Sequence, residues 1–130
     1  MDENIAKEYY ALIKSKISQG SIKTALDHAD KLLYNFPSDP CGYYYKGVCF
    51  FALENYDMSL KYYESAIKIN PAFAKAYFNL GINLYMLQKK DLALINVGKA
   101  LILFSREHDT EKKTRCINAL RIIGGENVNF

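Results

Sequence analysis

Apolar residues recur along most of the chain at intervals of three and four residues, the spacing that one face of an α-helix requires. The pattern is interrupted at short polar, proline-containing or glycine-containing segments, where helices are expected to end. The sequence therefore predicts an all-α protein. Its seven predicted helices are residues 3–18, 21–35, 40–53, 56–69, 73–87, 90–104 and 109–123.

The predicted joints between these helices have simple physical causes. Asp39 precedes Pro40, so a carboxylate that can cap a helix stands before a proline at the first helical position. Proline is tolerated there because the N–H that it lacks would make no hydrogen bond within the helix. Pro37 and Pro71 each end one helix and permit the next. Short turns, as antiparallel neighbours need, are predicted at residues 18–21, 54–55 and 88–89.

The chain also repeats itself with a period of 34 residues. Pro37, Pro71 and Ser105 are each one period apart, and three segments cut at these points align without a gap. The third segment has Tyr77, Leu80, Gly81, Leu84, Ala93 and Val97 at the repeated positions, with Ser105 in place of the proline. The second has Tyr43, Lys46, Gly47, Phe50, Ser59, Tyr63 and Pro71, and the first has Tyr9, Leu12, Ile13, Lys16, Ala25, Ala29 and Pro37.

This spacing, with two helices in each unit, resembles the tetratricopeptide repeat family over about residues 6–105. The resemblance implies a right-handed α-solenoid of three helix-turn-helix repeats and a seventh, capping helix. The expected organisation is a single domain, residues 1–125, with repeats at about 6–39, 40–73 and 74–107, a capping helix at about 109–123 and a flexible tail at 126–130.

Small residues at fixed positions predict close contact within each helix pair. Glycine inside a helix costs about 0.5–1 kcal/mol relative to alanine, so the recurrence of Gly47 and Gly81 one period apart indicates a packing reason. Ser59 and Ala93 are the small residues expected to face them.

The first repeat departs from this arrangement. Ile13 stands where the family prefers glycine, and Ala29 stands where it prefers a large aromatic residue. We interpret the pair as a compensating volume exchange: the larger Ile13 replaces glycine on one helix, and the smaller Ala29 replaces an aromatic residue on the neighbouring helix. The interpretation requires both side chains to lie in one core.

Composition and charge narrow the class of protein. The 130 residues are 50% hydrophobic and suffice for one core, and the net charge of +3 is too small to indicate nucleic acid or membrane as a partner. No apolar stretch reaches the roughly 18 residues of a membrane-spanning helix, and the acidic start lacks the features of a secretory signal. The expected location is therefore cytoplasmic. Three cysteines without a C-x-x-C spacing, Cys41, Cys49 and Cys116, are expected to be small packing residues.

Residues that carry catalytic or cofactor chemistry are scarce. The two histidines, His28 and His108, have no second ligand at a metal-binding spacing. The sequence has no glycine-rich phosphate loop and neither G-x-S-x-G nor H-E-x-x-H. We expect a protein that is not an enzyme and has no metal or cofactor.

The resemblance instead implies a concave groove lined by the first helix of each repeat, which binds a protein or peptide. Apolar and aromatic residues dominate the groove positions, so the predicted function is that of an adaptor or a chaperone-like module that holds a peptide through apolar anchors. The groove positions fall on Tyr10, Lys14 and Ile17 in the first repeat, on Tyr44, Tyr45, Val48 and Phe51 in the second, and on Lys75, Phe78, Asn79, Ile82 and Tyr85 in the third.

Size and groove character resemble those of small secretion chaperones of the same family. The clamp with which other members hold a terminal carboxylate is not expected, because neither Tyr10 and Lys14 nor Tyr44 and Val48 match its first pair. Two alternatives stay open. One is self-assembly through the groove or the apolar side of the first helices; the other is RNA binding by stacking tyrosines with Lys112, Lys113 and Arg115.

Overall fold

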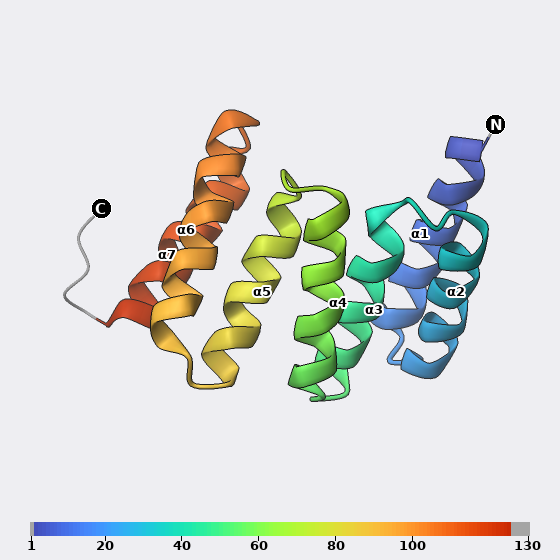
Figure 1. Cartoon of the computed structure of the whole chain (residues 1–130), viewed down its shortest axis with the longest axis horizontal. Helices are drawn as coiled ribbons and strands as arrows, with labels where there is room; N and C mark the ends of the chain where they lie inside the picture. The colour runs from blue at the N-terminus through green and yellow to red at the C-terminus, as the bar shows by residue number, and fades with distance from the viewer. Residues whose placement is uncertain (1, 126–130) are drawn as a thin grey trace. The chain divides into compact units, whose positions relative to one another are not determined.

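The computed structural model describes residues 2–125 and consists of seven helices joined by short turns (Figure 1). The prediction of an all-α helical-repeat fold is confirmed, and each helix begins and ends within two residues of its predicted bounds. No strand occurs among the described residues. The helices are α1 (Asp2–Ser18), α2 (Ile22–Asn35), α3 (Pro40–Ala52), α4 (Tyr56–Ile69), α5 (Ala74–Met86), α6 (Lys90–Arg106) and α7 (Thr110–Gly124).

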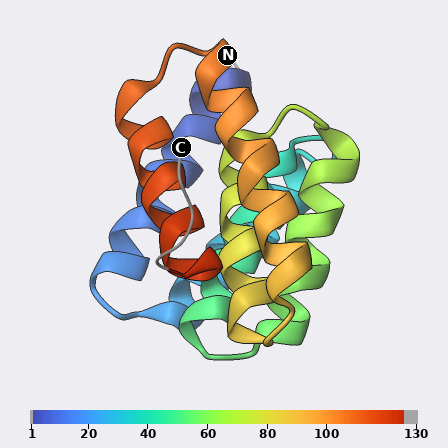
Figure 2. The ribbon, with the colours of Figure 1, turned by 90° about the vertical axis from the view of Figure 1, so that its left-hand side faces the viewer.

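The chain forms two compact units, one from Met1 to Ile69 and the other from Asn70 onward. In the N-terminal unit α1 packs against α2, α2 against α3, and α3 against α4. In the C-terminal unit α5 packs against α6, and α7 runs beside α6 and also touches α5 (Figure 2). The predicted tail, 126–130, lies outside the described residues.

The two helices of the second repeat pack closely at a glycine, as predicted. A Cβ atom at Gly47 would lie only 2.6 Å from the ring of Tyr63 on α4. Beside it, the buried hydroxyl of Ser59 donates a hydrogen bond of 2.6 Å to the Gly47 carbonyl. The absence of a side chain at Gly47 therefore allows α3 and α4 to approach closely, with the Tyr63 ring lying against bare backbone.

The third repeat repeats this contact with smaller partners. A Cβ atom at Gly81 would lie 2.5 Å from the Val97 side chain and 3.1 Å from the Ala93 carbonyl oxygen. In the first repeat the sizes are reversed, since Ile13 on α1 and Ala29 on α2 are both fully buried in one core cluster. The structure thus places Ile13 and Ala29 together, as the volume exchange requires.

The turns that end four of the helices share one backbone geometry. After α3, the amide of Asn55 donates to the carbonyl of Phe50 at 2.9 Å. The amide of Glu54 donates to the carbonyl of Phe51, also at 2.9 Å. This pair of bonds is the Schellman motif, in which one residue adopts the left-handed conformation that glycine favours. Only one of the four turns has a glycine there: the residues are Gly20, Glu54, Gln88 and His108, with φ of 77°, 59°, 62° and 57°.

Candidate binding faces

The apolar residues predicted to line a groove form one ridge on α3 and one on α5. The α3 ridge is Tyr44, Val48 and Phe51, and the α5 ridge is Phe78, Ile82 and Tyr85. Both have the spacing i, i+4 and i+7, which keeps three side chains on one face of a helix, and they are one 34-residue period apart. Tyr85 is exposed and the other five side chains are partly buried. Each ridge therefore presents apolar surface to solvent.

The α3 ridge rests on aromatic residues of its own unit. The Tyr44 ring meets the Tyr45 ring edge-on, with centroids 5.3 Å apart, and lies 5.9 Å from the Tyr63 ring. At the other end, Phe51 meets Tyr56 edge-on at 5.3 Å. These edge contacts are the arrangement that aromatic quadrupoles favour. They hold the ridge in place while leaving part of each ring open.

Tyr45 was predicted to line the groove, but it lies in the core instead. Only 7% of it is exposed, and it belongs to the core cluster that contains Ile13 and Cys49. The physical reason is the rotation of about 100° between successive helical residues, which turns Tyr45 inward when Tyr44 faces out. Burial raises the pKa of the Tyr45 hydroxyl well above its ordinary value. Tyr45 is thus a packing residue of the N-terminal unit.

Tyr10, on α1, is held by a bond within the protein. Its hydroxyl donates to Oδ2 of Asp39, whose Oδ1 accepts the amide of Cys41 at 2.9 Å and so caps α3. Burial, followed by this hydrogen bond, raises the pKa of Tyr10 well above its ordinary value. The predicted capping role of Asp39 is confirmed. The same carboxylate also fixes the Tyr10 ring, whereas Lys14, one turn further along α1, is exposed.

Raising the pH above about 10 is expected to destabilise the N-terminal unit. An unfolded tyrosine ionises near pH 10, whereas Tyr10 and Tyr45 keep their protons when folded because their pKa values are raised. The unfolded state then binds fewer protons than the folded state, so the free energy of unfolding falls as pH rises past 10 and is undiminished below it. Urea unfolding at about pH 8 and about pH 11 measures the fall. Tyr45→Phe should show a smaller fall, and an equal fall in both proteins would contradict the assignment.

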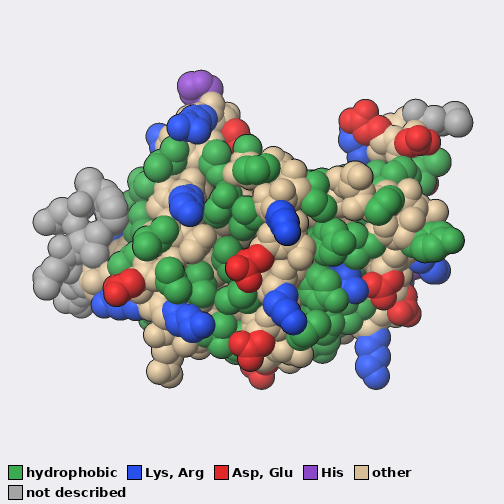
Figure 3. All heavy atoms as spheres, viewed as in Figure 1, with side chains coloured by type: hydrophobic (Ala, Val, Ile, Leu, Met, Phe, Trp, Pro, Cys, Tyr) green, Lys and Arg blue, Asp and Glu red, His purple; other side chains and the backbone are tan. Residues whose placement is uncertain are grey.

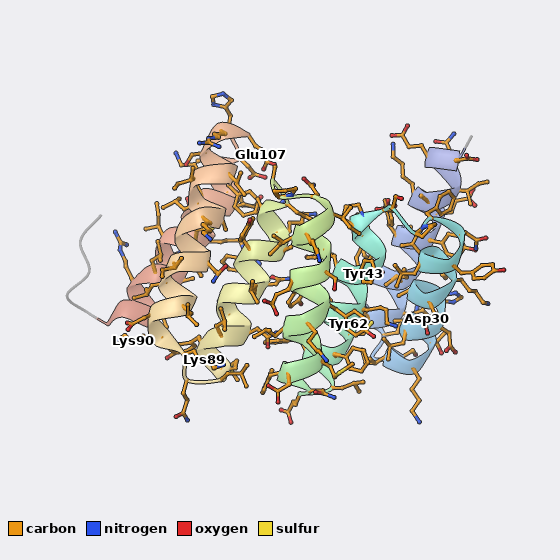
Figure 4. All side chains as sticks on the ribbon, in the orientation of Figure 1. Asp30, Tyr43, Tyr62, Lys89, Lys90 and Glu107 are labelled. Carbon is orange, nitrogen blue, oxygen red and sulfur yellow. The ribbon has the colours of Figure 1, made fainter. Side chains whose placement is uncertain are left out.

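A second aromatic group joins three helices of the N-terminal unit. Tyr62 on α4 stacks on Phe50 of α3 at 5.4 Å, and Lys46 Nζ lies 4.7 Å above the Tyr62 ring. The same ammonium group is 2.7 Å from Asp30 Oδ1 on α2. Figure 4 labels Asp30, Tyr62 and Tyr43, whose ring also stacks on Tyr62. Burial disfavours the Lys46 charge, but hydrogen bonds to Asp30 and Tyr62 outweigh it and raise the pKa of Lys46.

The α5 ridge has a neighbour that the predicted groove residues did not include. The guanidinium of Arg115, on α7, lies 5.5 Å above the ring of Phe78, a cation–π distance. Arg115 is itself exposed, as is Lys75, while Asn79 is partly buried. From the sequence alone, Arg115 was considered only for the RNA-binding alternative. The packing of α7 brings it to the ridge and adds a positive charge beside an apolar face.

The remaining chemistry of the described residues is sparse. Residues 2–125 contain no group of three or more His, Cys, Asp and Glu side chains that could hold a metal ion. Cys49 and Cys116 are fully buried, and burial raises the pKa of both thiols to about 11, so neither is a reactive thiolate at neutral pH. Within the same span, the helices are too short or too polar to cross a membrane.

Comparison with known proteins supports the repeat assignment. The tetratricopeptide repeat family matches residues 40–73, the second predicted repeat. No curated protein matches the sequence. This match over one repeat confirms the resemblance to tetratricopeptide proteins.

Solved structures show the same fold at low sequence identity. The type III secretion chaperone SycD of Yersinia enterocolitica, in complex with a peptide of the translocator YopD, is 18% identical, with 93% of each chain covered and a TM-score of 0.82. PcrH, in complex with the chaperone-binding region of PopD, is 17% identical, covers 98% of this chain and 97% of its own, and has a TM-score of 0.84. The TPR2B domain of yeast Sti1, in complex with an Hsp70 peptide, is 15% identical, with coverages of 92% and 95% and a TM-score of 0.84.

Proposed function

We propose that this protein is a non-enzymatic binding module, an adaptor or chaperone-like protein that holds peptide segments through apolar side chains. The binding elements are the α3 ridge and the α5 ridge, each of which receives apolar anchors of the ligand. Lys14 on α1, and Lys75 and Asn79 on α5, supply polar contacts to the peptide backbone or to acidic side chains.

The observation that carries this proposal is the recurrence of the ridge. Three apolar side chains at the same spacing appear on the first helix of two successive repeats, and their outer surfaces stay open after both units have packed their own cores. A core alone gives no reason for open apolar residues at the same three positions twice, with an aromatic ring at the first and third of them each time. A surface that binds apolar side chains does give one, because rigid rings offer large contact area at a low entropy cost.

The solved relatives support the choice of ligand class. SycD and PcrH were solved with segments of the translocators YopD and PopD, and the Sti1 domain with an Hsp70 peptide. All three are bound to peptide segments, and each shares this fold over most of its length. The open ridges of the present chain are suited to the same class of ligand, namely an extended or helical peptide with two or three apolar anchors.

Phe51→Asp and Phe78→Asp are each expected to weaken peptide binding by about 10-fold to 150-fold. The estimate follows from about 1.5–3 kcal/mol for burying one large apolar anchor. Binding is measured by fluorescence polarisation on short synthetic peptides with two or three apolar residues, beside matched peptides in which serine replaces them. Circular dichroism confirms that each variant keeps its helices.

Tyr34→Asp is the matched control, because Tyr34 is an aromatic residue on α2 that is 87% exposed and lies on neither ridge. It should bind the apolar peptides as the wild-type protein does. If folded Phe51→Asp and Phe78→Asp also bind like wild type, or if the serine peptides bind equally well, the ridges are not the binding faces.

A further inference from the structure

The outer face of α6 carries an apolar stripe that is open to solvent. This helix turns Val97, Ala100 and Phe104 into the core of the C-terminal unit. On its opposite side Ile95 and Ile102 are 53% and 54% exposed. Figure 3 shows hydrophobic side chains along this helix, which lies in front of α7 in the same view. A helix that is apolar on both sides is expected to be covered on both.

Gly98 lies in the middle of this stripe without a steric reason inside its own unit. A Cβ atom at Gly98 would meet no atom within 4 Å, whereas one at Gly81 would lie 2.5 Å from Val97. Glycine inside a helix costs about 0.5–1 kcal/mol relative to alanine. The close approach of a second helix explains this cost, because a bare backbone shortens the distance at which two helices pack.

The stripe is complementary to itself about its midpoint. Ile95 comes three residues before Gly98, and Ile102 comes three residues after Lys99. A two-fold axis between Gly98 and Lys99 therefore places Ile95 of one copy beside Ile102 of the other, twice in the same interface. Lys99 Nζ lies 5.7 Å from the centre of the Tyr77 ring on α5, so this ammonium group lies toward α5 and not at the centre of the stripe.

The charges at the two ends of the stripe obey the same symmetry. Asp91 comes seven residues before Gly98, and Arg106 comes seven residues after Lys99. Both are exposed, and within the part of the chain that the structure describes neither forms an ion pair. The two-fold axis brings Asp91 of each copy to Arg106 of the other. We propose that the outer face of α6 is a homodimer interface in which two copies of this helix pair in antiparallel orientation.

This interface is separate from the proposed peptide-binding function. The ridges lie on α3 and α5, whereas the stripe lies on α6 and faces away from the core of its unit. One pair of crossing helices buries less than the roughly 1,200–2,000 Å² of a standard interface. We therefore expect a reversible dimer whose population rises with protein concentration.

Sedimentation of the full chain over a range of concentrations tests the proposal. The wild-type protein should pass from monomer to dimer, and Ile95→Glu or Ile102→Glu should weaken the dimer about ten-fold or more, which is 1.4 kcal/mol. Ile122→Glu, at an exposed residue of α7, is the control and should leave association unchanged. Circular dichroism verifies the fold of each variant. A wild-type protein that stays monomeric, or a dimer that survives both stripe variants, overturns the proposal.

Two further variants test the close approach and the orientation. Gly98→Ala should weaken association while making the monomer more resistant to urea, because the added methyl group fits the monomer and obstructs the partner. Asp91→Arg and Arg106→Asp should each weaken the dimer, and the double variant should restore it. A Gly98→Ala protein that associates like wild type, or a double variant no better than its singles, contradicts the antiparallel pairing.

Discussion

Tyr63→Ala is expected to lower the free energy of unfolding by about 3–5 kcal/mol, the range for removing a large buried aromatic side chain. Tyr63 is 2% exposed, and its ring lies against the backbone of Gly47 across the α3–α4 pair. Glycine has no side chain that can move into the space the ring leaves. The cavity therefore cannot collapse easily, and the loss should fall toward the upper part of this range.

The first repeat shows how the cavity left by Tyr63→Ala can be filled. At the two equivalent positions it has Ile13 and Ala29, both fully buried, so a branched side chain on the first helix fills the space above an alanine. Gly47→Ile alone should also destabilise, because its Cβ atom would lie 2.6 Å from the Tyr63 ring. The double variant Gly47→Ile/Tyr63→Ala should be more stable than the sum of the two losses predicts, by about 0.5–3 kcal/mol.

Urea unfolding of the wild-type protein, the two single variants and the double variant measures this coupling. Helicity at 222 nm reports the unfolding of the whole chain, and the extrapolated free energies close a double-mutant cycle. If the two losses simply add, the volume exchange between the first and second repeats is not the reason for Ile13 and Ala29. The cycle therefore tests whether the repeats are variants of one packing solution.

The helices and their joints were predictable because their causes are local. Proline, a capping carboxylate and apolar spacing each act within a few residues, so Asp39 and Pro40 define the start of α3 in the sequence as they do in the structure. The left-handed residue in the three turns without a glycine was not predictable in the same way. Glu54 and Gln88 have no backbone preference for that conformation, and they adopt it because the helices on either side must pack.

The groove residues show that the sequence alone does not distinguish an exposed residue from its buried neighbour. Tyr44 and Tyr45 are chemically identical neighbours, and the repeat pattern assigned both to the groove. One residue of helical rotation separates an open ring from a buried one, and only the packing against α1 and α2 decides which is which. Arg115 was not predicted beside the groove for a related reason, since its place over Phe78 depends on how α7 lies against α5. Contacts between helices carry no local signal in the sequence.

Asn83 is another residue that the sequence did not single out, because its significance appears only with burial. Its side chain is fully buried on α5, and neither Nδ2 nor Oδ1 has a hydrogen-bond partner among the described residues. Each buried polar group left in this state costs about 1–3 kcal/mol. One period earlier, the second repeat has the small and equally buried Cys49 at this position. The position therefore accepts a side chain that has no amide group to be hydrogen-bonded.

Asn83→Leu is expected to raise the free energy of unfolding by about 1–3 kcal/mol, because leucine has nearly the same shape and leaves no polar atom unpaired. Asn83→Cys, which copies the second repeat, should also stabilise, but by less, since it leaves part of the volume empty. Asn96→Leu is the matched control: Asn96 is on α6 and its amide already donates to the Leu92 carbonyl at 2.9 Å, so a change within about 0.5 kcal/mol is expected. A lower urea midpoint for Asn83→Leu would mean that the amide is paired in solution, and that this buried polar group contributes to the stability of the C-terminal unit.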